Sequence, residues 1–150
     1  MIMYFEYGLW SLFFASFLAA TILPFSSEAL LAFLIASDYN LYSCLIVATA
    51  GNWLGGMSGY FLGYAGKWAW IERWLKIKPE RLKITKANLV KYGSLMAFFT
   101  WLPVIGDVLA VGLGLIRSNI IYVSLFMLAG KFLRYMALAY FADWGAKQIL

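Results

Sequence analysis

Apolar residues fill four long stretches of the chain, at 7–37, 41–66, 92–116 and 118–142. Each stretch is long enough to cross about 30 Å of hydrocarbon as an α-helix. A polar turn at 38–40 and a basic segment at 67–91 separate them. The pattern therefore predicts an all-α integral membrane protein.

The first and third stretches are each interrupted by a proline, with an acid four positions later. Proline removes a helical hydrogen bond and clashes with the preceding turn, whereas serine and an acid suit the start of a helix. We expect half-helices at about 9–23 and 27–37, and a similar break in 92–117. Two arrangements fit this pattern, a continuous kinked helix or a helical hairpin that re-enters the membrane from one side. The residues expected at the two breaks are Pro24, Ser26, Ser27, Pro103 and Gly106.

Glycines recur every four residues in the second stretch, which gives one helix face without side chains. These glycines are Gly51, Gly55, Gly59 and Gly63. In a membrane such a face lets another backbone approach closely. We expect these glycines, together with Gly130, to serve helix packing, and a lipid-lined groove along the same face is compatible with that role.

The chain resembles itself at an offset of 79 positions. When 21–66 is compared with 100–145, eleven positions are identical, and Glu28 meets Asp107. The informative matches are the prolines, the acids, the asparagines Asn40 and Asn119, and the Ala-Gly pairs. We interpret this as a duplication within a single membrane domain, 1–150, with repeat 1 at about 9–66 and repeat 2 at about 92–145.

The duplication predicts an inverted repeat. A hairpin makes no net crossing of the membrane and the following helix makes one, so a linker that stays on one face inverts the second repeat. Inverted repeats with interrupted helices near the bilayer midplane are a recurring plan of secondary transporters. We therefore expect two broken, re-entrant hairpins, each followed by a transmembrane helix and joined by the segment 67–91.

Composition strengthens the membrane interpretation and excludes several classes of protein. Of the 150 residues, 64% are hydrophobic and 13% charged, against about 25% charged in soluble domains. The chain has no histidine, one cysteine, and no nucleotide-binding or hydrolase motif. We expect no enzyme, no catalytic residue, no metal site and no cofactor. The first segment lacks a basic region and a cleavage site, so we interpret it as mature protein.

The net charge of +5 is concentrated in one place, since eight of the twelve basic residues lie in 67–91. A basic segment between membrane helices favours the cytoplasmic face and anionic lipid, not nucleic acid. Tryptophans at helical spacing predict an amphipathic helix in the headgroup layer, and a solvated loop is the alternative. Hairpins would then place both termini in the periplasm, whereas four full spans would place both in the cytoplasm.

Four charged residues lie inside apolar sequence: Glu28, Asp107, Lys131 and Arg134. Each costs roughly 2.5–3.5 kcal/mol at the centre of a bilayer. They are either packing ion pairs or a central site for a charged headgroup or a proton. A carboxyl group removed from water tends to keep its proton, so Glu28 and Asp107 are candidates for proton transfer or gating. The candidates for headgroup binding are Lys131, Arg134, Asn52 and Thr100.

Three phrases resemble the DedA superfamily, also described as VTT or SNARE-associated domains, and within it the YqaA-like branch. They are Gly51-Asn52-x-x-Gly55-Gly56-x-x-Gly59-Tyr60-x-x-Gly63, Trp101-Leu102-Pro103-Val104-Ile105-Gly106-Asp107 and Gly130-Lys131-x-x-Arg134-Tyr135. The resemblance covers about 10–140. It implies two facing re-entrant hairpins and a carrier of lipids such as phospholipids or undecaprenyl phosphate, with proton coupling and with Glu28 as the hairpin acid.

The chain departs from the superfamily pattern at three positions. Typical members have arginines where this chain has Thr100 and Gly106, and often an acid where it has Gly56. Because arginine is a natural phosphate ligand, Lys131 and Arg134 are the residues that could replace it here.

We expect a multi-pass flippase or scramblase of the bacterial inner membrane. Its partners would be lipids with anionic headgroups, protons and further copies of the chain. A proton-coupled exporter of small cations and a non-transporting, membrane-organising protein are the alternatives.

Overall fold

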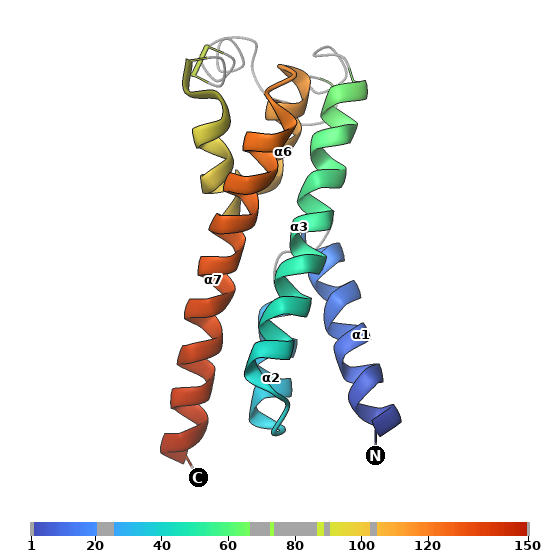
Figure 1. Ribbon diagram of the computed structural model, residues 1–150, viewed down its shortest axis with the longest axis vertical. Helices are drawn as coiled ribbons and strands as arrows, with labels where there is room; N and C mark the ends of the chain where they lie inside the picture. Colours follow the sequence, from blue (N-terminus) through green and yellow to red (C-terminus); the bar gives the residue numbers. More distant parts are fainter. Residues whose placement is uncertain are drawn as a thin grey trace. The chain divides into compact units, whose positions relative to one another are not determined.

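The computed structural model describes residues 2–20, 26–66, 73, 87–88, 91–102 and 105–149. Every regular element in these ranges is a helix (Figure 1). The elements are α1 (Ile2–Ala19), α2 (Ser26–Ala36), α3 (Leu41–Ala65), the 3₁₀-helix η1 (Gly93–Trp101), α6 (Ile105–Leu115) and α7 (Ile120–Ile149). The all-α prediction is therefore confirmed for the described residues.

The chain forms two compact units. The first contains Met1–Gly55 and Lys131–Leu150, and the second contains Gly56–Gly130. The first unit thus consists of α1, α2, the first part of α3 and the last part of α7. The second consists of the rest of these two long helices with η1 and α6.

In the first unit, α1 and α2 double back on each other and pack together (Figure 1). Tyr39, which follows α2, donates a hydrogen bond from its hydroxyl to the carbonyl oxygen of Tyr4 at 3.0 Å, and its ring lies 4.3 Å from that of Phe5. Gly8 leaves room for the Tyr39 ring, since a Cβ there would lie 2.5 Å from the hydroxyl. A continuous helix over 2–36 would hold these ends about 50 Å apart, so the segment is a hairpin.

In the second unit, η1 and α6 pack against each other. The sequence predicts an α-helical half here, but residues 93–101 wind as a 3₁₀-helix. Because a 3₁₀-helix has three residues per turn, the Thr100 hydroxyl lies over the preceding turn and donates to the Ala97 carbonyl at 2.6 Å. Gly106 at the start of α6 lies against the backbone of Thr100.

The turns before α3 and α7 have the same construction, at positions 79 apart. Asp38 and Arg117 both adopt left-handed backbone conformations, with φ of 63° and 53°. The next residue in each turn donates to a carbonyl five positions earlier, at 3.1 Å, which is the Schellman pattern of helix termination. Asn40 and Asn119 then cap the following helices through their side-chain oxygens.

Two helix ends differ from the sequence prediction. Helix α1 begins at Ile2 instead of about residue 9, since residues 2–8 contain no proline and only Gly8 as a weak helix former. Helix α7 continues to Ile149 instead of ending at about 143. Lys147 and Asp143 are one helical turn apart and form an ion pair at 2.7 Å. This pair stabilises the added turns of α7.

Several predicted features lie outside the described residues. They are the two prolines Pro24 and Pro103, the side chains of Ser26 and Asp107, and most of the basic segment 67–91.

Many large apolar side chains are exposed, and several polar side chains are buried among the apolar residues of the core. Large apolar and aromatic side chains are exposed along the helices, among them Trp10, Phe14, Phe33 and Phe141. The buried side chains include serines, threonines, Asn52 and Lys131. Among the described residues α7 is the one helix long and apolar enough to cross a bilayer. The span expected at 41–66 stays a prediction, because glycines and Asn52 lower the hydropathy of α3.

The glycine face of α3 carries different neighbours in the two units. In the first unit a Cβ at Gly51 would collide with the carbonyl oxygen of Phe13, and one at Gly55 would lie 2.5 Å from that of Phe17. Helix α1 therefore lies directly on this face.

In the second unit α6 occupies the same face of α3. A Cβ at Gly59 would lie 3.6 Å from the Val111 side chain, and one at Gly63 would collide with the Val111 carbonyl. Gly130 of α7 lies against the carbonyl oxygen of Phe98 in the same way. Glycine at these positions lets backbones meet without side chains between them.

Replacement of Gly63 by alanine should lower the free energy of unfolding by roughly 1–3 kcal/mol, because the added methyl group meets backbone atoms that cannot move aside. Gly145→Ala is the matched control, since no atom lies within 4 Å of a Cβ at that position. It should raise the free energy by about 0.5–1 kcal/mol through helix propensity. Unfolding in detergent micelles, followed by circular dichroism, measures both. If Gly63→Ala and Gly145→Ala changed the free energy of unfolding equally and in the same direction, close packing at Gly63 would not be the cause.

Candidate functional site

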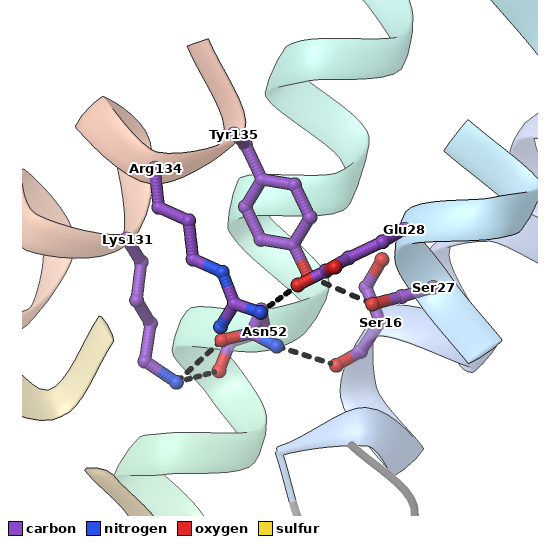
Figure 2. A network of polar contacts seen from close by, with 7 residues as sticks. All are labelled: Ser16, Ser27, Glu28, Asn52, Lys131, Arg134 and Tyr135. Carbon is purple, nitrogen blue, oxygen red and sulfur yellow. Dashed lines mark hydrogen bonds and ion pairs between the residues drawn. The ribbon is translucent and has the colours of Figure 1, made fainter. Parts of the chain in front are cut away.

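Seven polar residues from four helices meet in the first unit (Figure 2). They are Ser16 of α1, Ser27 and Glu28 of α2, Asn52 of α3, and Lys131, Arg134 and Tyr135 of α7. Two cations and one carboxylate are among these side chains. The elements that carry them are otherwise strongly apolar, so the network is the polar centre of this unit.

Lys131 and Asn52 form the deepest contact of the network. The Lys131 ammonium donates to the Asn52 carbonyl oxygen at 2.7 Å and to the Asn52 Oδ1 at 2.6 Å. The Asn52 Nδ2 in turn donates to the Ser16 carbonyl oxygen at 3.1 Å. Lys131 is only 2% exposed. Since a buried ammonium must be hydrogen-bonded, these contacts hold α7, α3 and α1 together.

Glu28 and Arg134 form an ion pair between the Oε1 and Nη2 atoms. Glu28 lies in the first turn of α2, where the helix dipole favours an anion. Arg134 lies three residues after Lys131 and therefore on the same face of α7. The side chains of Glu28 and Arg134 are 32% and 17% exposed, so this pair is more accessible than Lys131.

A second contact joins the same two helices next to the ion pair. The hydroxyl groups of Ser27 and Tyr135 lie 3.0 Å apart, and both residues are buried. Neighbouring residues of α2 thus contact neighbouring residues of α7. The first turn of α2 is fixed to α7 by one charged and one neutral contact.

Two buried hydroxyl groups in the first unit have no hydrogen-bond partner among the described residues: those of Ser16 and Thr49. Leaving a buried hydroxyl unsatisfied costs about 1–3 kcal/mol. Ser16 belongs to the network through its carbonyl oxygen, and its Cβ lies beside Gly51. Ser16 thus brings a buried hydroxyl group without a described partner to a residue of the network.

The predicted site residues divide between the two units. Glu28, Asn52, Lys131 and Arg134 meet in the network, together with Ser27. Thr100 is buried in the second unit, where its hydroxyl is bonded to its own helix. Gly106 packs against it, and the Asp107 side chain lies outside the described residues.

The sequence did not single out Ser16 and Tyr135 as site residues. Ser16 is a lone polar residue in an apolar run, and Tyr135 directly follows Arg134, so both carried a weak signal. Neither signal indicates a partner, because the partners come from other helices. In the described part of the chain, no group of three or more metal-ligating side chains could hold a metal ion.

Substitution of Asn52 by leucine and of Lys131 by methionine should each lower the free energy of unfolding, by about 1–3 kcal/mol. Because the two side chains are bonded to each other, the double variant should lose less than the sum, with a coupling of roughly 0.5–3 kcal/mol. Detergent unfolding of the four proteins of this cycle measures the coupling. Additive losses would mean that the contact contributes nothing of its own.

Two curated relatives of this chain are bacterial inner membrane proteins. The chain is 36% identical to the inner membrane protein YqaA of Escherichia coli over 133 residues, which covers 88% of this chain and 89% of that protein. The Shigella flexneri protein of the same name matches equally. An uncharacterized protein of Haemophilus influenzae is 34% identical over 140 residues, 86% of this chain and 83% of that one.

Neither a protein-family model nor a solved structure matches the chain. The identity to YqaA nevertheless extends over nearly the full length of both proteins. It is consistent with the DedA superfamily resemblance and with the many exposed apolar side chains of the helices. The chain therefore belongs to the YqaA family of membrane proteins.

Proposed function

We propose that this protein is a membrane lipid transporter of the flippase or scramblase type. It would move phospholipids or polyprenyl-phosphate lipids across the bacterial inner membrane, coupled to protons. The observation that carries the proposal is the polar network of the first unit, which contains Glu28, Lys131 and Arg134 among helices with apolar exteriors. Ionisable groups at membrane depth are costly, and they commonly mark a substrate or proton pathway.

The partial exposure of the Glu28–Arg134 pair supports a site that a ligand can reach. A structural ion pair in lipid would gain from complete burial, whereas these side chains keep 32% and 17% of their surface exposed. A guanidinium group is also the cation best suited to a phosphate group, because its N–H groups form a fork. The headgroup would bind here while the acyl chains stay against the apolar exterior.

An inverted repeat is the architecture that we propose for transport. Helices α2 and α6 have bounds that differ by 79 positions at both ends, and the turns that follow them have the same hydrogen bonds. Asn52 and Lys131 are also 79 positions apart and are bonded to each other. Two residues at equivalent positions of the repeats are thus in direct contact, which supports the duplication.

The same architecture gives the topology. Each hairpin would re-enter the membrane without crossing it, and α3 and α7 would cross it. The basic segment 67–91 would face the cytoplasm, where anionic lipids attract it. The name of the Escherichia coli relative, an inner membrane protein, supports the choice of membrane.

Reconstitution of the purified protein into liposomes tests the function. Labelled phosphatidylglycerol should cross the bilayer in these proteoliposomes, and Arg134→Ala should slow it by about tenfold or more, the value of a charge-assisted hydrogen bond. Asp143→Asn removes a comparable but remote ion pair and is the control. Uptake of small cations without lipid movement would favour an exporter, and neither activity would favour a membrane-organising protein.

Exchange of Asn52 and Lys131, the two bonded residues at equivalent repeat positions, tests the repeat. Asn52→Lys combined with Lys131→Asn should recover the free energy of unfolding of the unmodified protein to within about 1 kcal/mol, because the pair is re-formed with its members reversed. Each single variant should be less stable than the double. A double variant no more stable than the worse single would argue against equivalent environments at positions 52 and 131.

A further inference from the structure

The two cations of the network differ in what they can do. Lys131 is 2% exposed, and its ammonium is bonded to both oxygen atoms of Asn52. A ligand could reach it only after the contact between α3 and α7 had opened. Arg134 is 17% exposed and contacts a side chain from a short helix. Lys131 is thus a positioning residue, and Arg134 is the cation that an incoming anion meets.

Glu28, which pairs with Arg134, carries a carboxylate, and a carboxylate resembles a phosphate group in its charge and its oxygen atoms. Carboxylate and phosphate oxygens accept the same pair of N–H bonds from a guanidinium group. The Glu28 carboxylate contacts the guanidinium group through Nη2, so a phosphate group cannot form a two-bond contact that includes Nη2 while Glu28 holds that N–H group. The Glu28 carboxylate therefore occupies the place that the phosphate group of a substrate would take.

We propose that Glu28 is a built-in competitor at Arg134, which the phosphate group of the transported lipid must displace. The inference rests on the proposed lipid-transport function and specifies how its site is regulated. The Ser16 hydroxyl, buried without a partner among the described residues, is a second donor in the same network. Protonation of Glu28 would remove its charge and release Arg134 for the ligand.

Glu28 is the carboxylate of the described network, so its protonation is the step that would change its pair with Arg134. From helix α7, Arg134 reaches Glu28 and Tyr135 reaches the neighbouring Ser27, whereas Lys131 points to Asn52 (Figure 2). Helix α3 has no charged residue, and its thiol, Cys44, is buried in the apolar core. The one charged residue of α1, Glu6, lies in the exposed first turns, in the part of α1 that Tyr39 contacts.

Binding of dodecyl phosphate to the full chain in a neutral maltoside detergent tests the proposal without requiring transport. At neutral pH, Glu28→Gln should raise the affinity about two- to fivefold, since it removes a competing ion pair but keeps the shape of the side chain. Arg134→Gln should lower the affinity about tenfold or more. Asp143→Asn should bind like the unmodified protein.

The pH dependence gives a second readout. Lowering the pH should narrow the difference between the unmodified protein and Glu28→Gln, because the protonated Glu28 no longer competes. The comparison is made at the same pH, so the titration of the probe itself cancels. Circular dichroism checks the fold of each variant, and Arg134→Lys, which keeps the charge but loses the fork, should bind with intermediate affinity if Arg134→Gln does not fold.

The outcomes separate this inference from the proposed function. A weaker affinity of Glu28→Gln, or an unchanged affinity of Arg134→Gln, would overturn the inference even if the protein moves lipids. The expected order of affinities without lipid movement in liposomes would support the inference and reject lipid transport. If inorganic phosphate shows the same order and dodecyl phosphate does not bind, Glu28 still competes at Arg134, but the ligand is free phosphate.

Discussion

A buried ammonium group has to be hydrogen-bonded, and the structure of the first unit follows from how this is done for Lys131. Both of its described acceptors belong to Asn52, one on the backbone of α3 and one on the side chain. Asn52 reaches onward to the backbone of α1 at Ser16. These hydrogen bonds join α1, α3 and α7 at one level of the helix bundle of the first unit. The next residues of α7, Arg134 and Tyr135, then meet the first turn of α2.

The polar contacts require that backbones come close, which the glycines of α3 permit. Gly51 stands next to Asn52, and the α1 backbone lies on it at Phe13. With a larger residue at Gly51, α1 would be pushed away from α3, and the Ser16 carbonyl oxygen would move out of reach of the Asn52 amide. The polar network thus depends on the glycine face, because close packing of the helices keeps its hydrogen bonds short. Short hydrogen bonds matter here because lipid offers the polar groups no alternative partner.

Sequence patterns predicted the elements better than the contacts between them. The offset of 79 positions marked equivalent helices, turns and caps, because local structure depends on local residues such as Asn40 and Asn119. The pattern also singled out Glu28, Asn52, Lys131 and Arg134, since charged and amide groups are conspicuous in apolar helices. It could not show that Glu28 pairs with Arg134, or that Ser16 and Tyr135 join them, because helix packing brings these residues together. The 3₁₀ winding of η1 was missed for a related reason, as its apolar sequence also suits an α-helix.

The account depends on a lipid phosphate group entering the network of the first unit. Photo-crosslinking measures this most directly, with a phospholipid that carries its reactive group at the phosphate end, followed by mass spectrometry of the labelled peptides. The account predicts labels on the segments around Ser16, Glu28 and Arg134, which lipids without the phosphate group do not give. Labels confined to the exposed aromatic residues, such as Trp10, Phe14 and Phe141, would contradict it.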